Sequence, residues 1–515
     1  MAILDLRCLA DAHSTTCDVA IVGAGAAGLL LAATLAQQGV AVAVLEAGGS
    51  ISAGEQKLGA EAVVEGGVYR ATREGRAFGL GGTTALWGGQ IVPHSEFDFR
   101  AQEAGFDFWR HLVAIVERRA GAVCATLGLT PTCRWFHAAE CIPPAAVAAL
   151  RGRGLEIVTG DWLPFRRRNL AFLAERGTFD VYLNAPACGW EIATEAGGAA
   201  RIRSVTARAG EKTLSVQARE YVLAAGAIES TRVLLEIERS LGREFRAGSE
   251  LGRGLADHLS CRVADVLPED LGRCAETFAP RFRSGRMRSF RFVERGAPPG
   301  SPRGFFHFIF DTENAGFALA RKVLQGVQGR AMPRVTLAEA VRGAAGIGAL
   351  GWERFVRRRL HVPRGRPAHL QLDIEQARNP GNRIALSDSR DAAGRPRASV
   401  QWSVSRADEE AIQWMAARFL AAWGGAPALP RLAAALGDAS SLKPHDVYHP
   451  VGTCRMGTDA GAVVDPESRV HGAANLSVAS TAVFPSAGTA NPTFSMLCLA
   501  AELAERVAAK PSSPG

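Results

Sequence analysis

A glycine-rich turn near the start of the chain constrains its fold more than any other feature. Residues 18–23 form a short apolar run that predicts a buried parallel strand, and Gly23, Gly25 and Gly28 follow it as GxGxxG. In such a turn the first glycine permits the tight bend, the second lets the backbone approach a pyrophosphate, and the third allows close packing of helix on strand. Residues 26–38, rich in Ala and Leu, predict the helix that must follow.

The next segment completes a βαβ unit. Gly39 takes the position that favours a left-handed helix cap, and residues 41–46 predict a second buried strand that ends at Glu46. An acid placed 18 residues after Gly28 is positioned to accept hydrogen bonds from a ribose hydroxyl. The unit predicts a dinucleotide site whose pyrophosphate rests on the helix N-terminus. The acid argues against NADP, and it leaves NAD and FAD as alternatives.

A second glycine-rich segment, GLGGTTALWGG, covers residues 79–89. With five glycines in eleven residues it is expected to form neither a helix nor the interior of a strand. One interpretation is a mobile surface loop. The presence of Leu80, Leu86 and Trp87 among the glycines favours another, a glycine-lined wall against a flat ring or a phosphate.

Two patches near the C-terminus carry candidate catalytic groups. His449 lies in VYHPVGTCRMG and is a candidate general base, because an imidazole can take a proton near neutral pH. Asn491 lies in STAVFPSAGTANPTFSM, directly before Pro492. On residue chemistry alone a structural histidine and a helix N-cap asparagine explain these positions at least as well.

Composition limits the partners. The chain of 515 residues carries 59 Lys and Arg against 51 Asp and Glu, a net charge of +8. The arginine-rich runs 281–295 and 354–366 lack the interleaved aromatic residues of nucleic-acid modules, so we expect solvated surface and no nucleic-acid partner. An anionic substrate for the run 281–295 is the weaker alternative.

Cysteine usage and the N-terminus predict a cytoplasmic protein with reduced thiols. The ten cysteines form no CxxC pair, and their spacing suggests neither a metal site nor a disulfide scaffold. The N-terminus lacks a secretion signal, and the longest apolar stretch, residues 19–35, is interrupted by glycines, so no membrane span is expected.

Elsewhere the pattern predicts strands between 178 and 225, at 368–374 and at 383–386, and helices at 406–423 and 493–508. Residues 106–160 are expected to alternate between helices and loops. Residues 270–370 are poorly periodic and permit no assignment.

Five motifs occur in a single order along the chain. They are the GxGxxG unit with Glu46, GLGGTTALWGGQ, YVLAAGAIESTRVLL at 221–235, LGRGLADHL at 251–259, and the two C-terminal patches. Together they resemble the glucose–methanol–choline (GMC) oxidoreductases, FAD enzymes that oxidise alcohols and sugars. The resemblance implies an α/β fold with a discontinuous Rossmann-like FAD domain and an α+β substrate domain built on a mostly antiparallel sheet. The implied division is 15–95, 178–262 and 440–510 for FAD, 263–439 for substrate, and 96–177 as a connecting or lid region.

The resemblance also implies roles for single residues. His449 takes the place of the family's active-site histidine, and Asn491 that of a second histidine or an asparagine. With the sequence ANPT, this pair is most similar to the branch of pyranose oxidase and bacterial sugar or polyol dehydrogenases. The implied cofactor-binding residues are Gly23, Gly25, Ala26, Gly28, Glu46, Ala47, Gly81, Gly82, Thr83, Thr84, Leu86, Ala225, Gly226, Asp257, His258, Ser480, Thr481, Ala490, Pro492 and Thr493.

Two departures from the family pattern affect the cofactor. Leu86 stands where covalently flavinylated relatives carry a histidine, so FAD is expected to bind non-covalently. Ser480 stands where many members have an aspartate near the flavin.

The expected reaction follows from the resemblance. His449 would accept the proton of a secondary hydroxyl of a sugar, glycoside or polyol, Asn491 would bond the same oxygen, and a hydride would pass to flavin N5. The alternatives are a lyase of the same fold, an oxidoreductase acting on a non-sugar alcohol, and a non-catalytic FAD-binding protein. The motifs identify neither the electron acceptor (oxygen, a quinone or a protein) nor the oligomeric state.

Overall fold

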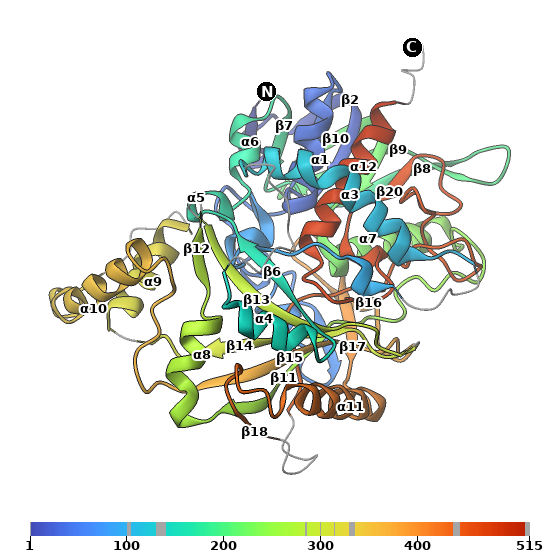
Figure 1. The fold of residues 1–515 in the computed structure, drawn as a ribbon. Coiled ribbons are helices and arrows are strands. Elements are labelled where there is room, and N and C mark those ends of the chain that lie inside the picture. Colours follow the sequence, from blue (N-terminus) through green and yellow to red (C-terminus); the bar gives the residue numbers. More distant parts are fainter. Residues whose placement is uncertain are drawn as a thin grey trace.

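Three β-sheets organise the part of the chain that the structure describes (Figure 1). The ends of two of them meet around one cavity. The structure is a computed structural model, and it describes residues 2–99, 105–129, 141–283, 286–298, 300–313, 315–328, 335–435 and 443–509. No helix within these ranges is both long and apolar enough to cross a bilayer.

The first sheet is the dinucleotide-binding sheet predicted from the glycine turn. Its strand order is β1-β7-β3-β2-β10-β9-β8, and β20 also pairs with β10. The pairings are parallel from β1 to β10 and antiparallel at β9 and β8. The strands are β1 (Ile3–Asp5), β2 (Ala12–Val22), β3 (Val42–Leu45), β7 (Asp180–Leu183), β8 (Ala187–Thr194), β9 (Ala200–Ala209), β10 (Lys212–Leu223) and β20 (Leu476–Val478).

Helices bury this sheet. All four residues of β3 are buried, which explains why its sequence is continuously apolar. The helix α1 (Ala26–Gln37) packs against the C-terminal helix α12 (Thr493–Ala508), which in turn packs against α3 (Phe108–Thr126). The last helix of the chain therefore covers the first βαβ unit, as Figure 1 shows.

The second sheet has nine strands among the described residues, and its pairings are antiparallel, in agreement with the mostly antiparallel sheet that the family resemblance implied. The helix α11 (Arg406–Trp423) lies on it, with the ring of Phe419 stacked 3.8 Å from that of Phe306. The strands are β5 (Gln90–Ile91), β6 (Leu155–Trp162), β11 (His258–Val266), β12 (Arg281–Arg283), β13 (Arg286–Glu294), β14 (Gly304–Phe310), β15 (Ala368–Glu375), β18 (Leu432–Ala434) and β19 (His445–Asp446).

A small third sheet joins β16 (Arg383–Arg390), β17 (Pro396–Trp402) and β4 (Val63–Gly66). The remaining helices are α2 (Arg70–Arg73), α4 (Pro144–Arg151), α5 (Phe165–Arg168), α6 (Phe172–Arg176), α7 (Gly226–Leu241), α8 (Leu271–Phe278), α9 (Ala315–Gln328) and α10 (Leu337–Phe355). In Figure 1 the pair α9 and α10 projects from the side of the molecule beside α5.

The local predictions are largely confirmed. The βαβ opening is present, with Gly39 in the left-handed conformation at φ 78°, and the helices predicted at 406–423 and 493–508 have those bounds. One prediction was wrong: the glycine-rich segment contains a short 3₁₀ turn, Gly82–Ala85. Left-handed backbone at Gly81 and Gly82 makes that turn possible.

The unassigned region 270–370 contains strands of the second sheet and three helices. The strand β13 in this region was not predicted from the sequence, because an arginine occupies one of its buried positions: Arg291 is only 4% exposed. Residues 155–162, in the predicted connecting region, also belong to this sheet. The division of the chain into domains stays a prediction.

Candidate active site

Two of the three glycines in the turn, Gly23 and Gly28, leave no room for a side chain. Gly23 has φ 111°, and a Cβ on Gly28 would lie 2.0 Å from the carbonyl oxygen of Gly23. At Gly25 a Cβ would meet only the carbonyl oxygen of Ala224, at 3.9 Å. The helix α1 begins directly after Gly25 with no side-chain cap, so its first N–H groups are available to an anion.

The carboxylate of Glu46 ties the turn to the second glycine-rich segment. It accepts backbone N–H bonds from Ala24 at 2.8 Å, from Gly48 at 2.9 Å and from Gly79 at 2.8 Å. A carboxylate offers about four acceptor positions, so one remains for the ribose that the sequence predicts. Burial raises the pKa of Glu46 above its ordinary value, against the effect of these three bonds.

The second glycine-rich segment is packed rather than loose. The N–H of Gly81 donates to the carbonyl of Ala24, and the indole N–H of Trp87 donates to the carbonyl of Arg168 at 2.7 Å. A Cβ on Gly82 would lie 2.9 Å from the Cα of Gly25. Here glycine is needed because two backbone segments approach closely, which supports the interpretation as a wall.

One cavity of about 550 Å³ runs past both segments to the C-terminal patches. It is lined by most residues predicted for the site: Gly23, Gly25, Ala26, Glu46, Ala47, Gly82, Thr83, Thr84, Leu86, Ala225, Gly226, His449, Ser480, Thr481, Asn491, Pro492 and Thr493. Gly28, Gly81, Asp257, His258 and Ala490 are not on its wall. Motifs from the beginning, middle and end of the chain are thus brought to one space.

The residues of this cavity fit FAD. The uncapped helix start and the open position at Gly25 suit a pyrophosphate, and Glu46 suits a ribose. Arg232 also lines the cavity, is 2% exposed, and has no hydrogen-bond partner for its Nη2 among the described residues. A buried guanidinium donor of this kind is satisfied when a ligand with acceptor atoms binds.

His449 lines the cavity and forms a chain of two imidazoles with His258. The Nε2 of His258 lies 2.9 Å from the carbonyl oxygen of Gly488, and its Nδ1 lies 3.0 Å from the Nδ1 of His449. A carbonyl only accepts, so Nε2 of His258 carries the hydrogen and its Nδ1 accepts from Nδ1–H of His449. In neutral rings the lone pair of His449 is therefore on Nε2.

Burial and the neighbouring imidazole of His258 hold the pKa of His449 well below its ordinary value. Arg291 lowers this pKa further, whereas Asp373 acts in the opposite direction. Burial also lowers the pKa of His258. Both rings are thus neutral at neutral pH, the state that a general base requires.

The side chain of Asn491 is held in place by Arg291. The guanidinium donates to Oδ1 of Asn491 and, at 2.6 Å, to Oε1 of Gln90. With Oδ1 occupied, the amide turns Nδ2 towards Nε2 of His449, 3.3 Å away. The N-cap explanation of Asn491 is wrong, because Pro492 occupies the N-cap of α12 and no side chain caps it.

Asp257 anchors the backbone that carries His449. Its carboxylate accepts N–H bonds from His449 at 2.9 and 3.0 Å and from His258 at 2.8 Å, and the hydroxyl of Tyr69 donates to it at 2.9 Å. Tyr448, one residue before His449, has φ 68°, which is rare for a residue with a side chain. Asp257 thus holds a strained segment from behind the cavity.

Comparison with known proteins agrees with this geometry. A family model described as "FAD dependent oxidoreductase" matches residues 18–243, and one described as "GMC oxidoreductase" matches residues 378–500. The chain belongs to the GMC oxidoreductases. As a GMC oxidoreductase it is an FAD-dependent enzyme that acts on an alcohol group.

Relatives of this GMC oxidoreductase are distant. It is 23% identical over 540 residues to 6'''-hydroxyparomomycin C oxidase of Streptomyces lividus, a match covering 93% of this chain and 89% of that one. It is 29% identical over 333 residues to 5-(hydroxymethyl)furfural oxidase of Methylovorus sp., covering 59% and 54%.

Two solved structures share the fold of this GMC oxidoreductase. Pyridoxine 4-oxidase from Mesorbium loti has a TM-score of 0.56 at 17% identity, with 95% of this chain and 99% of that chain covered. A formate oxidase from Aspergillus oryzae has a TM-score of 0.56 at 15% identity, with 96% and 98% covered.

Sequence reasoning missed several groups of this site. Gln90, Trp162 and Tyr448 line the cavity that contains His449, and none belonged to the predicted set. Arg291 was assigned with its run to solvated surface, which is wrong for this residue. The local pattern held no signal for Arg291. It alternates with Phe290 and Phe292, as a charged residue on the solvated face of a half-buried strand does.

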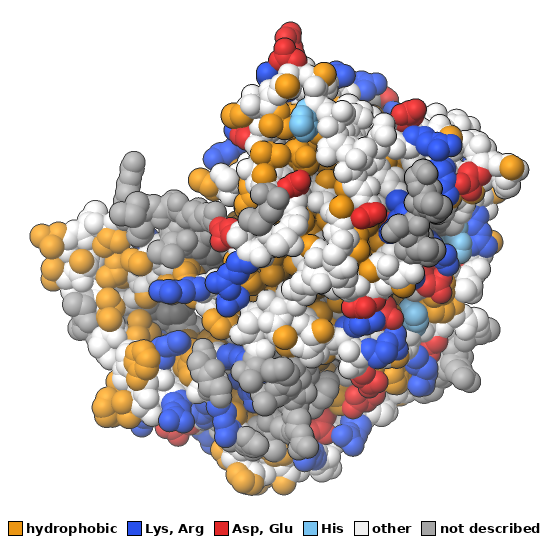
Figure 2. All heavy atoms as spheres, turned by 90° about the horizontal axis from the view of Figure 1, so that it is seen from above, with side chains coloured by type: hydrophobic (Ala, Val, Ile, Leu, Met, Phe, Trp, Pro, Cys, Tyr) orange, Lys and Arg blue, Asp and Glu red, His pale blue; other side chains and the backbone are white. Residues whose placement is uncertain are grey.

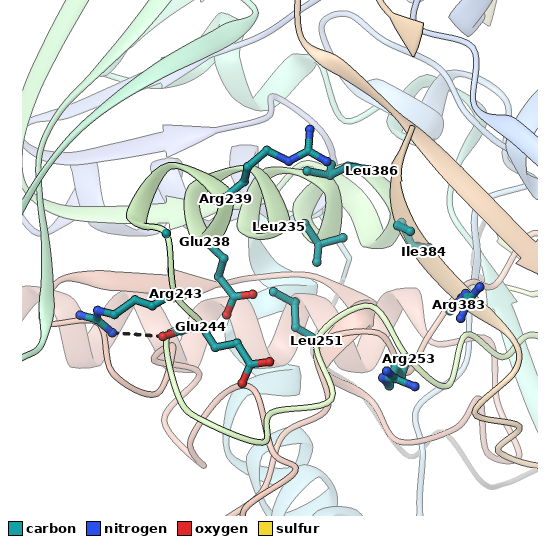
Figure 3. A pocket seen from close by; sticks show the side chains of 12 residues that line it. Leu235, Glu238, Arg239, Arg243, Glu244, Leu251, Arg253, Arg383, Ile384 and Leu386 are labelled. Carbon is teal, nitrogen blue, oxygen red and sulfur yellow. Dashed lines mark hydrogen bonds between the residues drawn. The ribbon is translucent and has the colours of Figure 1, made fainter. Parts of the chain in front are cut away.

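A second hollow of about 570 Å³ lies outside this site (Figure 3). It is formed by α7 and β16, with Leu235, Leu251 and Ile384 facing the space. It shares no lining residue with the cavity that contains His449, and none of the predicted site residues lies on it. It is therefore not a candidate for the FAD or alcohol site.

The titration of Asp257 predicts how stability changes with pH. Burial and then the neighbouring Asp446 raise the pKa of Asp257 to about 8. A carboxyl with a raised folded pKa binds a proton more tightly when folded, so its contribution falls as pH rises from its unfolded value towards 8. Asp257→Asn removes this titration, and its free energy of unfolding should fall less steeply with pH, by up to about 1.4 kcal/mol per pH unit.

Denaturant unfolding of the two proteins between about pH 5 and pH 8 measures this difference. Asp388→Asn, at an exposed aspartate, is the control and should keep the wild-type slope. Parallel curves for Asp257→Asn and wild type would contradict the assignment.

Proposed function

We propose that this GMC oxidoreductase oxidises a secondary hydroxyl of a sugar, glycoside or polyol, with His449 as the base. The observation that carries the proposal is the lone pair on Nε2 of His449, directed by the imidazole chain towards Asn491 at the cavity wall. FAD, when bound non-covalently, supplies the acceptor for the hydride that leaves the carbinol carbon.

The residues around the reacting oxygen have separate tasks in this proposal. Nε2 of His449 takes the hydroxyl proton, and Nδ2 of Asn491 donates to the same oxygen as negative charge develops on it. Arg291 polarises the Asn491 amide from behind. His258 accepts from Nδ1–H of the protonated His449 ring and itself donates to the carbonyl of Gly488, which keeps the His449 ring in place.

The polar and aromatic lining supports a polyhydroxylated substrate. Gln90 and Asn491 offer amide groups, while Trp87, Trp162 and Tyr448 offer aromatic surface on the same wall. Amides bond hydroxyl groups, and aromatic rings pack against the C–H faces of a sugar ring. The relative named as an oxidase of 6'''-hydroxyparomomycin C is consistent with a hydroxylated substrate.

An anaerobic panel tests this function. Sugars, glycosides and polyols are expected to bleach the bound flavin, and simple primary alcohols to do so more slowly. Faster bleaching by simple alcohols would contradict the substrate class, and absence of bleaching by every member would favour a non-redox lyase. Turnover with oxygen, with a quinone and with a dye then identifies the acceptor.

Arg291 should set the pH range of the reaction. His449 acts only when unprotonated, so flavin reduction is lost as pH falls through the pKa of His449. Because Arg291 lowers that pKa, Arg291→Met should move the loss to higher pH and slow the maximal rate by about tenfold, as the amide of Asn491 loses its anchor. Arg291→Lys should retain most of the low-pH activity.

The pH profile of anaerobic flavin reduction measures this effect. Arg288→Met is a matched control on the same strand, because Arg288 pairs with Asp161 at 2.7 Å outside the cavity. If Arg291→Met is slower but its pH profile is not shifted, Arg291 does not influence the pKa of His449 and has only a structural role.

A further inference from the structure

The projecting helix α10 exposes large apolar side chains near both of its ends, and on one face these form what we call the stripe. Leu337, Val341, Trp352 and Phe355 are 81%, 68%, 60% and 77% exposed. Their spacing places them on one face of the helix. Large apolar side chains at this exposure are costly unless something covers them, and Figure 2 shows hydrophobic side chains over the projecting lobe.

The opposite face of α10 packs on α9, so the stripe points away from the protein. The two helices cross in close contact, since a Cβ on Gly316 of α9 would lie 2.4 Å from the backbone of Gly346 in α10. Gly343 is buried in the same helix. The stripe is therefore the outer surface of a helical hairpin.

Cations surround one end of the stripe. Residues 335–366 contain seven arginines and two glutamates, a net charge of +5. Arg354, Arg358 and Arg364 are exposed and form no ion pair with described residues, although Arg354 stacks on Phe282 and Phe355. Apolar and aromatic side chains beside free arginines are typical of helices that lie in the surface of an anionic bilayer.

We infer that α10 seats this enzyme on an anionic lipid bilayer, with the stripe in the acyl boundary and the arginines at the headgroups. A second copy of the chain is a poorer occupant, because it would bring an equally cationic surface against the same arginines. Binding of this kind at the bilayer surface needs no membrane-spanning helix, and the inference does not depend on the proposed substrate.

The seating has a consequence for the active site. Helix α9 lies against α5, and the carbonyl of Arg168 in α5 holds Trp87 on the cavity wall. A bilayer under the stripe would therefore lie on the side of the molecule that carries this wall, with α10 and α9 between them.

Vesicle sedimentation of the FAD-loaded protein tests the inference. The protein should sediment with vesicles of phosphatidylcholine and phosphatidylglycerol, less with phosphatidylcholine alone, and less at high salt. The double variant Trp352→Ser/Phe355→Ser should lower the bound fraction by about tenfold or more. Arg358→Glu/Arg364→Glu should lower it by a similar factor on anionic vesicles only.

A control variant and a second measurement separate the outcomes. Ile51→Ser/Val68→Ser removes two exposed apolar side chains elsewhere and should bind vesicles as wild type does. Flavin content and flavin reduction should be unchanged in all variants, so failure of the proposed reaction would be seen separately. Absence of vesicle binding, binding unaffected by the stripe variant, or a concentration-dependent dimer lost in that variant without vesicle binding would each overturn the inference.

Discussion

His449→Ala is expected to slow reduction of the bound flavin by substrate by about 10²- to 10⁴-fold, the usual contribution of a general base. The proton of the substrate hydroxyl then has no acceptor at the position of Nε2. FAD should remain bound, because the glycine turn, Glu46 and Arg232 lie on other parts of the cavity wall. Anaerobic stopped-flow spectroscopy measures the rate, and the flavin spectrum of the purified protein measures occupancy.

His471→Ala provides a matched control. His471 bonds the carbonyl of Gly457 at 3.0 Å and does not line the cavity, so its loss should leave flavin reduction near the wild-type rate. If His449→Ala reduces the flavin at the wild-type rate, His449 has no part in the chemical step. Loss of FAD from the variant would instead assign His449 to cofactor binding.

A pair of glycine substitutions should separate folding from cofactor binding. Gly28→Ala places a methyl group 2.0 Å from the backbone oxygen of Gly23, so the helix and strand must move apart. We expect the unfolding free energy to fall by at least about 1–3 kcal/mol, with most FAD lost as a result. Denaturant unfolding of the protein and its flavin content measure the two effects.

Gly25→Ala should leave the fold intact and weaken FAD binding. Its backbone has φ −81°, and its Cβ would meet only one atom, at 3.9 Å, so the apoprotein should keep its stability within about 0.5 kcal/mol. The methyl group would nevertheless stand on the cavity wall where the pyrophosphate is expected. Full FAD occupancy in Gly25→Ala would contradict the placement of the pyrophosphate at this turn.

Features that depend on neighbours along the chain were predictable. The GxGxxG unit and the helices at 406–423 and 493–508 follow from local periodicity and glycine position, whereas the antiparallel second sheet was implied by the family resemblance that the order of the motifs carries. The bound FAD and the class of reaction follow from motifs that occur together in one family. These features need no knowledge of which distant segments meet.

The arrangement around His449 needed the tertiary structure. Arg291 belongs to a basic run whose local sequence predicts solvent-exposed side chains. It is buried only because β13 pairs with β6 and faces the C-terminal loop. Asn491 has the local context of a helix cap, yet its side chain bonds Arg291 and His449 instead.

By itself, the sequence determined that this chain is a flavin-dependent alcohol oxidoreductase, and it predicted a cofactor site at the glycine turn and a catalytic role for His449. Only the tertiary structure decided which nitrogen of His449 is free, how Asn491 is turned, and which apolar helix face is left exposed. The physical reason is the distance along the chain between the residues that interact. A turn or a helix is set by residues within a few positions, whereas His258, Arg291 and Gly488 act on His449 across long stretches of chain.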